Sequence, residues 1–260
     1  MHASLLVSLL AAALLAGTAA RADEQAARSA LETSQAAIGN TLPALEFIAS
    51  DGRPVTLASL GGRPLVLSLV YTSCHHVCPL ITRNLASAVE IGRDALGEDA
   101  FTVVTLGFDW AADTPDRMRM FAATQGINEP DWYFLSGDEA SIRALTEATG
   151  FLFVPSSKGF DHLSQTTVVD RDGVVYRQVY GAALDAPALV EPLKELVYDT
   201  PADAGLVAHW VDTFRLFCTV FDPRLGRYEF DYSILMTVIT GLLCLGAVAV
   251  FIVREWRRHE

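Results

Sequence analysis

Residues 64–79 read PLVLSLVYTSCHHVCP and join two different patterns. Residues 64–71 are almost continuously apolar, which is typical of a central strand buried on both faces of a sheet. Residues 79–96 carry apolar side chains at helical spacing and end at a glycine, which predicts an amphipathic helix. Two thiols, Cys74 and Cys78, therefore lie where a buried strand ends and a helix begins.

The position of these two cysteines predicts thiolate chemistry. The first N–H groups and the dipole of a helix stabilise negative charge, so they favour thiolate over thiol. Four residues are slightly more than one helical turn, so Cys74 and Cys78 share a face, and both sulfurs can reach one ion or each other. Soft thiolates select Cu(I) over hard cations, and an imidazole would complete a trigonal site. Disulfide exchange and soft-metal binding are thus the two expected chemistries, with a purely structural disulfide as the alternative.

Strands alternate with helices along the rest of the chain. Strands are expected over residues 45–49, 55–59, 101–108 and 132–135, helices over 115–125, 136–149 and 186–197, and a hairpin over 165–180. The hairpin turns at Asp172-Gly173, because Asp-Gly is a strong turn signal. This order predicts an α/β fold, with a mixed sheet flanked by helices on both faces.

The N-terminus has the pattern of an export signal. Residues 3–16 are apolar and uncharged, and they are too short to span a bilayer comfortably. Small residues follow, with Ala20 and Ala22 in an A-x-A cleavage pattern. We therefore expect a cleaved signal peptide over residues 1–22.

The C-terminus predicts a membrane anchor. Residues 233–253 are an uncharged run of 21, enough for a helix across about 30 Å of hydrocarbon. Three arginines follow within residues 254–260, and positive charge marks the cytoplasmic side. This pattern predicts a transmembrane helix, a cytoplasmic tail, and a juxtamembrane linker over residues 199–232.

The net charge and the number of cysteines exclude some classes of function. A net charge of −12 argues against nucleic-acid binding, because little here would neutralise phosphates. Four cysteines are too few for a disulfide scaffold. In an oxidising compartment, Cys74 and Cys78 will form a disulfide unless something reduces or metallates them.

A thiol pair between the first central strand and its helix is the position of the redox site in thioredoxin-like folds, although thioredoxins use C-x-x-C. The whole pattern resembles the Sco/SenC family of copper-handling thioredoxin-fold proteins, over about residues 38–198. The resemblance rests on C-x-x-x-C-P at residues 74–79, F-D-x-x-x-D-T-P at 108–115, and D-H at 161–162 followed by T-T-V-V-D-R-D-G at 166–173.

The resemblance implies a thioredoxin-like Sco domain over residues 38–198 that binds one copper ion per chain through Cys74, Cys78 and His162. It implies a membrane-tethered chaperone that delivers copper to the copper A centre of cytochrome c oxidase during its assembly. The alternative is a thiol-disulfide oxidoreductase that reduces the acceptor cysteines, with Cys74 attacking and Cys78 resolving. A peroxiredoxin-like peroxidase is a third, weaker alternative, because a T-x-x-C signature is lacking.

The implied partner is the copper-binding subunit of the oxidase, with a periplasmic thiol reductase or copper donor as a further partner. The implied location is the inner membrane, with one span and the domain in the periplasm. Two features depart from the family pattern. His75 and His76 stand where the family usually has an acidic residue, and the expected anchor is C-terminal rather than N-terminal. The role of Cys218, between domain and anchor, stays open.

Overall fold

The computed structural model describes residues 25–74, 77–129, 131–157, 159–198, 219–222, 225, 227–230, 236–237 and 239–246. The expected signal peptide and cytoplasmic tail lie outside the described residues, as do His75, His76 and Cys218. The chain divides into two units, Met1–Val197 and Tyr198–Glu260.

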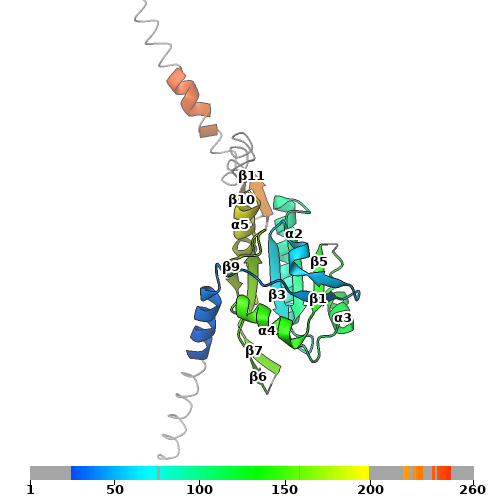
Figure 1. The fold of residues 1–260 in the computed structure, drawn as a ribbon. Coiled ribbons are helices and arrows are strands. Elements are labelled where there is room, and N and C mark those ends of the chain that lie inside the picture. The colour runs from blue at the N-terminus through cyan, green and yellow to red at the C-terminus, as the bar shows by residue number, and fades with distance from the viewer. Residues whose placement is uncertain are drawn as a thin grey trace, which may run out of the picture. The chain divides into compact units, whose positions relative to one another are not determined.

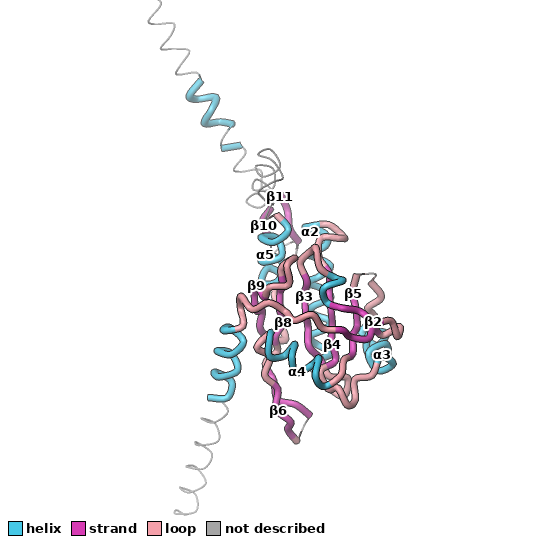
Figure 2. Tube along the Cα trace, in the orientation of Figure 1, coloured by secondary structure: helices cyan, strands magenta, loops and turns pink. Residues whose placement is uncertain are grey.

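A seven-stranded mixed sheet forms the first unit, in the order β2-β1-β5-β4-β3-β8-β9 (Figures 1 and 2). Its three central strands are parallel, namely β3 (Leu65–Val70), β4 (Thr102–Gly107) and β5 (Trp132–Ser136). Antiparallel strands complete the sheet, with β1 (Glu46–Ala49) and β2 (Pro54–Thr56) on one side and β8 (Gln165–Val169) and β9 (Val175–Tyr180) on the other. The mixed α/β sheet expected from the sequence is confirmed.

Helices cover both faces of this sheet. They are α2 (Val77–Leu96), α3 (Pro115–Gln125), α4 (Glu139–Ala148) and α5 (Ala186–Val197), with residues 25–36 also helical. Helix α2 packs against α3 and α5, whereas α4 lies over the other face (Figure 1). A Cβ atom at Gly92 would lie only 3.2 Å from the Phe101 ring and 3.4 Å from Val190, so α2 approaches the sheet and α5 closely because this position is glycine.

Burial of the central strands explains why the apolar pattern is continuous there. All six residues of β3 and all six of β4 are buried, because helices cover both faces. Each fully buried leucine or valine side chain in these strands contributes about 1.5–3 kcal/mol relative to exposure. The strands thus form a rigid base, and the loops at their carboxyl ends carry the cysteines.

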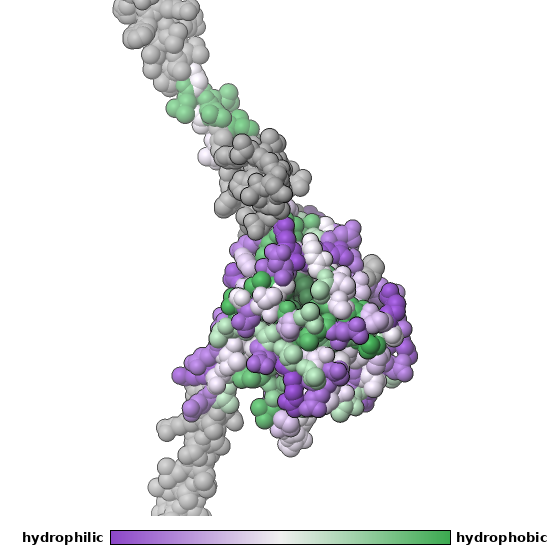
Figure 3. All heavy atoms as spheres, in the orientation of Figure 1, coloured by the Kyte–Doolittle hydropathy of each residue, from purple (hydrophilic) through white to green (hydrophobic). Residues whose placement is uncertain are grey.

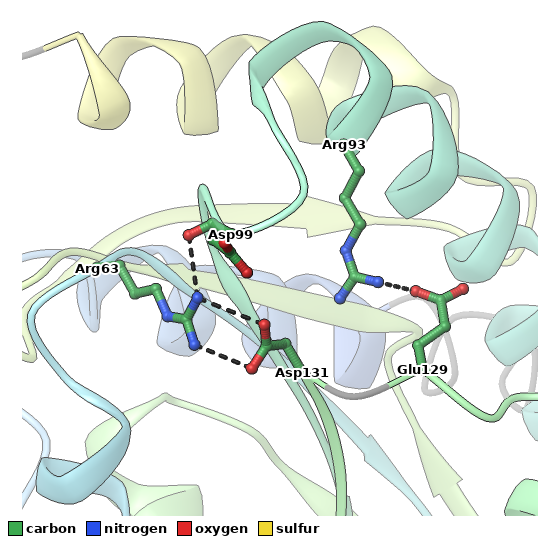
Figure 4. A network of polar contacts seen from close by, with 5 residues as sticks. All are labelled: Arg63, Arg93, Asp99, Glu129 and Asp131. Atoms are coloured by element: carbon green, nitrogen blue, oxygen red, sulfur yellow. Dashed lines mark hydrogen bonds and ion pairs between the residues drawn. The ribbon is translucent and has the colours of Figure 1, made fainter.

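Ion pairs fix the opposite end of the sheet (Figure 4). Arg63, just before β3, bonds to the Asp131 carboxylate with Nη2 to Oδ1 at 2.9 Å, and its Nη1 donates to the Asp99 carbonyl at 3.0 Å. Arg93 of α2 pairs with Glu129, ahead of β5. These contacts tie the starts of the three parallel strands together, away from the cysteines.

A second antiparallel hairpin was not expected from the sequence. Strands β6 (Phe153–Ser156) and β7 (Gly159–His162) pair with each other and form a separate two-stranded sheet. Leu152 and Val154 are 45% and 62% exposed. Figure 3 shows hydrophobic surface where the hairpin projects from the domain. The hairpin carries Asp161-His162, so it determines where the histidine lies.

The second unit contains a short hairpin and a helical segment. Strands β10 (Thr219–Asp222) and β11 (Arg227–Phe230) pair within the expected linker, with the Phe221 and Tyr228 ring centroids 5.3 Å apart. The described helical residues are 236–237 and 239–246.

The prediction of a transmembrane helix over residues 233–253 is wrong. Within the described part of the chain, no helix is both long enough and apolar enough to cross a membrane. An uncharged run of 21 residues satisfies the length criterion in the sequence, whereas the structural criterion asks for a helix that is both long and apolar.

Candidate functional site

The two cysteines meet at the first turn of α2. After β3 ends, the Cys74 N–H donates to the Tyr71 carbonyl at 3.1 Å, which closes the loop. The Cys78 N–H then donates to the Cys74 sulfur at 3.4 Å. The sulfur of Cys74 therefore accepts from an N–H at the start of α2, as the strand-to-helix position predicted.

The two thiols differ in burial. Cys78 is fully buried, whereas Cys74 is half-buried, and no disulfide joins these two described residues. Burial raises the pKa of the Cys78 thiol well above its ordinary value; a hydrogen bond with the Tyr71 backbone opposes this, and the nearby Cys74 adds to it. Cys74 is therefore the thiol that a partner can reach, and Cys78 stays protonated behind it.

His162 ends β7 with a defined tautomer. Its Nδ1 lies 2.8 Å from the Leu163 carbonyl oxygen, and a carbonyl only accepts, so Nδ1 carries the proton. Burial lowers the pKa of His162, although the Leu163 hydrogen bond and the Asp161 charge act in the opposite direction. The ring is therefore neutral at pH 7, and Nε2 keeps a lone pair, which is the form that binds metals.

Tyr71 connects the cysteines to the histidine. Burial, followed by a hydrogen bond with the Cys74 side chain, raises the pKa of Tyr71, whereas a hydrogen bond with the Phe160 backbone lowers it. Its ring meets the His162 ring edge to face, with centroids 6.1 Å apart. Gly159 lies so close that a Cβ atom there would be 2.8 Å from the hydroxyl. This role of Tyr71 was not predictable from the sequence, where Tyr71 is simply the last apolar residue of the strand.

Aromatic rings hold His162 in place from several sides. Phe108 follows β4 and Phe151 follows α4, and each has its ring centroid 5.4 Å from that of His162. Phe160 of β7 packs on Tyr71 at 5.3 Å. The imidazole thus lies in a cluster of aromatic rings, which accounts for its burial.

The structure brings Cys74 and Cys78 together and places His162 in the adjoining cluster. Within the described residues, however, no group of three His, Cys, Asp or Glu side chains is arranged to hold a metal ion. His75, His76 and Cys218 lie outside those residues, and Cys244 is exposed in the second unit.

Asp113 is a site residue whose role the sequence did not reveal. Its carboxylate is buried and accepts from the Thr72 N–H at 2.8 Å, the Thr72 hydroxyl at 2.7 Å and the Asp109 N–H at 3.0 Å. Thr114, not Asp113, caps α3 by accepting from the Arg117 N–H. Asp113 therefore fixes the loop that leads into Cys74, and burial raises the pKa of its carboxyl group.

Comparisons with known proteins agree with this geometry. The chain is 25% identical over 140 residues to the SCO1 protein homolog of Bacillus subtilis, over 52% of this chain and 71% of that protein. The fold matches a BsSco structure described as having a disulfide switch, from the Sco family of cytochrome c oxidase assembly proteins, with a TM-score of 0.54 and 21% identity over 62% of this chain and 96% of that one.

A copper-bound relative has the same fold. ScoI of Arabidopsis thaliana, solved with copper bound, matches with a TM-score of 0.52 and 21% identity, over 61% of this chain and 97% of that chain. Sco proteins are thus known in copper-bound form, and the domain is thioredoxin-like. The model of the SCO1/SenC family matches residues 34–198, which include Cys74, Cys78 and His162, so the chain belongs to the SCO1/SenC family.

Proposed function

We propose that this protein binds copper through Cys74, Cys78 and His162 and delivers it to the copper A centre of cytochrome c oxidase during assembly. One observation carries the proposal. A half-buried thiol accepts from the N–H of the buried cysteine at the start of α2, and Tyr71 of the preceding segment packs its ring on a neutral imidazole. Membership of a family whose relatives bind copper and assist oxidase assembly supports it.

The residues present suit copper as cargo. Two thiolates and one imidazole form a soft donor set, and copper in its reduced state favours such ligands. His162 already presents Nε2 with a lone pair, because Nδ1 is bonded to the Leu163 carbonyl. Cys78 loses its proton on metal binding, since a thiol ligand binds as thiolate.

A second function rests on the thiols alone. The 3.4 Å contact between the Cys78 N–H and the Cys74 sulfur supports this function, because an exchangeable pair requires two neighbouring cysteines. In this alternative, Cys74 attacks a disulfide of the acceptor and Cys78 then releases the acceptor's thiol. The acceptor gains two electrons, and Cys74 and Cys78 become a disulfide.

Copper titration of the full chain, reduced and oxidised, tests the first function. We expect one copper per reduced chain, and loss of binding in the oxidised chain and in the Cys74→Ser, Cys78→Ser variant. Cys244→Ser is the matched control and should bind normally, because Cys244 belongs to the second unit. Equally tight binding by the double variant would show that copper lies elsewhere.

Transfer distinguishes the two functions. Copper-loaded protein mixed with the reduced apo copper-binding fragment of the oxidase should lose its copper as the copper A spectrum develops. In a second mixture, reduced, metal-free protein meets the oxidised fragment: if that fragment gains two thiols as Cys74 and Cys78 form a disulfide, and no copper passes in the first mixture, the protein is a reductase. We further propose that the domain works in the periplasm after removal of residues 1–22, which mass spectrometry of the periplasmic protein would test.

A further inference from the structure

A groove opens beside Cys74, between the first turns of α2 and helix α3. Its cavity volume is about 420 Å³, and Cys74 forms part of its wall. Arg83 of α2 and Arg117, Met120 and Phe121 of α3 line it. A molecule that reacts at Cys74 would therefore contact this groove with the atoms that flank its reacting group.

The charge of this groove is opposite to that of the chain. Aspartates and glutamates outnumber lysines and arginines by 31 to 19 overall, yet none of the groove's lining residues carries a carboxylate. Arg83 Nη1 donates to the Gln125 side-chain oxygen at 3.0 Å, and Arg117 Nη1 donates to the Ala112 carbonyl at 3.5 Å. Within the described residues neither guanidinium has an acidic partner, so both keep their charge available.

Apolar side chains accompany the charged groups. Met120, which lines the groove, is 67% exposed. Outside the groove lining, Val77 and Leu80 in the first turn of α2 are each 43% exposed. Arginine and methionine are enriched where proteins meet, so this combination suits a polypeptide better than an isolated anion.

We propose that this groove binds an acidic, cysteine-bearing segment of a partner protein and directs its cysteine to Cys74. The inference rests on the proposed function, because either copper transfer or disulfide exchange requires the partner's sulfur to reach Cys74. Residues flanking that cysteine must then lie along the surface next to Cys74, where the two arginines complement carboxylates. Such complementarity mainly raises the association rate and selects the partner.

Two matched peptides test the proposal on the full, metal-free chain with Cys78, Cys218 and Cys244 changed to serine. Each peptide carries one cysteine as a 2-pyridyl disulfide, flanked by four glutamates in one peptide and four glutamines in the other. The Cys74 thiolate attacks the peptide sulfur, forms a mixed disulfide and releases pyridine-2-thione, which is followed by absorbance. The glutamine peptide controls for any change in the intrinsic reactivity of Cys74.

We expect the acidic peptide to react at least about fivefold faster at low ionic strength, within the range of electrostatic steering. In Arg83→Gln, Arg117→Gln the two rates should become equal. Arg53→Gln, Arg177→Gln removes the same charge from two positions that do not line the groove, and it should keep the ratio. Equal rates in the parent chain, or the same ratio in both double variants, would overturn the proposal.

Copper titration separates this result from the function itself. Arg83→Gln, Arg117→Gln should still bind one copper per chain, because neither arginine is a proposed ligand. If copper binds normally but the peptide ratio is one, only the docking proposal fails. If the ratio is held but the parent chain binds no copper, only the copper proposal fails.

Discussion

A hydrogen bond with the side chain of Cys74 is, after burial, the main cause that raises the pKa of Tyr71. The ring of the same tyrosine packs edge to face on the imidazole of His162. A hydroxyl donated to a sulfur stabilises the thiolate over the thiol, because charge strengthens a hydrogen bond.

Tyr71→Phe keeps the ring and removes this donor. We expect iodoacetamide to alkylate Cys74 several-fold more slowly at pH 7, because the thiolate loses a hydrogen-bond donor. The measurement uses reduced, metal-free chains in which Cys74 is the sole cysteine. Tyr176→Phe is the matched control, because its hydroxyl bonds to Glu195 instead. An unchanged rate in Tyr71→Phe would show that the hydroxyl does not tune Cys74.

Gly159→Ala should disturb the site from the hairpin side. Gly159 has a φ of +114°, and an added Cβ would lie 2.8 Å from the Tyr71 hydroxyl oxygen. Backbone strain and this clash together should cost about 1–3 kcal/mol in the free energy of unfolding. Gly173→Ala is the control, because Gly173 has φ +81° with nothing within 4 Å of its Cβ position. Urea unfolding should show a clearly larger loss for Gly159→Ala, and equal losses would contradict the contact.

Local patterns predicted the central sheet well. Strands β3 and β4 were recognisable because helices cover both their faces, so every position is apolar or buried. The start of α3 was recognisable because Thr114 and Pro115 are typical capping and first-turn residues, and Thr114 does cap the helix. The prediction of a strand over residues 55–59 was wrong beyond Thr56. The Thr56 side chain accepts a hydrogen bond from the Ser59 N–H, and a 3₁₀ turn begins there.

Long-range packing explains what the sequence could not reveal. The β6–β7 hairpin has a proline in one strand and no clear alternation, and it is held by rings that follow other elements, such as Phe108. Asp113 bonds to Thr72, 41 residues earlier in the chain. The adjacency of Cys74 and Cys78 was predictable because the two residues are four positions apart where a strand meets a helix, whereas the position of His162 depends on that hairpin.

Asp113→Asn should change the pH dependence of stability. Burial raises the pKa of Asp113 above 3.8, so the folded chain holds this proton more tightly than the unfolded chain does. The ionised carboxylate therefore costs stability, and the contribution falls as pH rises from about 4 through the raised pKa. The unfolding free energy of wild type minus that of Asp113→Asn should therefore fall as pH rises over that range. Urea titrations at successive pH values measure it.

Asp138→Asn is the matched comparison with the opposite sign. Asp138 caps α4, and hydrogen bonds from Ser141 lower the pKa of its carboxyl group. Its contribution is present above pH 3.8 and is lost as pH falls through the lowered pKa. The advantage of wild type over Asp138→Asn should therefore grow with pH. The same direction for both variants would contradict one of the two assignments.

His162→Phe separates copper binding from disulfide exchange. Phenylalanine preserves a ring among Tyr71, Phe108 and Phe151 but has no Nε2, so the fold should persist while the proposed nitrogen ligand is lost. We expect copper affinity to fall at least about tenfold, as loss of one ligand of a soft site implies. Reduction of a model disulfide by Cys74 and Cys78 should change much less, because exchange uses only the two sulfurs. Competition with a copper chelator measures the affinity, and circular dichroism checks the fold. Unchanged copper affinity in a folded His162→Phe chain would move the nitrogen ligand to His75 or His76, and equal loss of both activities would mean that His162 supports the thiols rather than the metal.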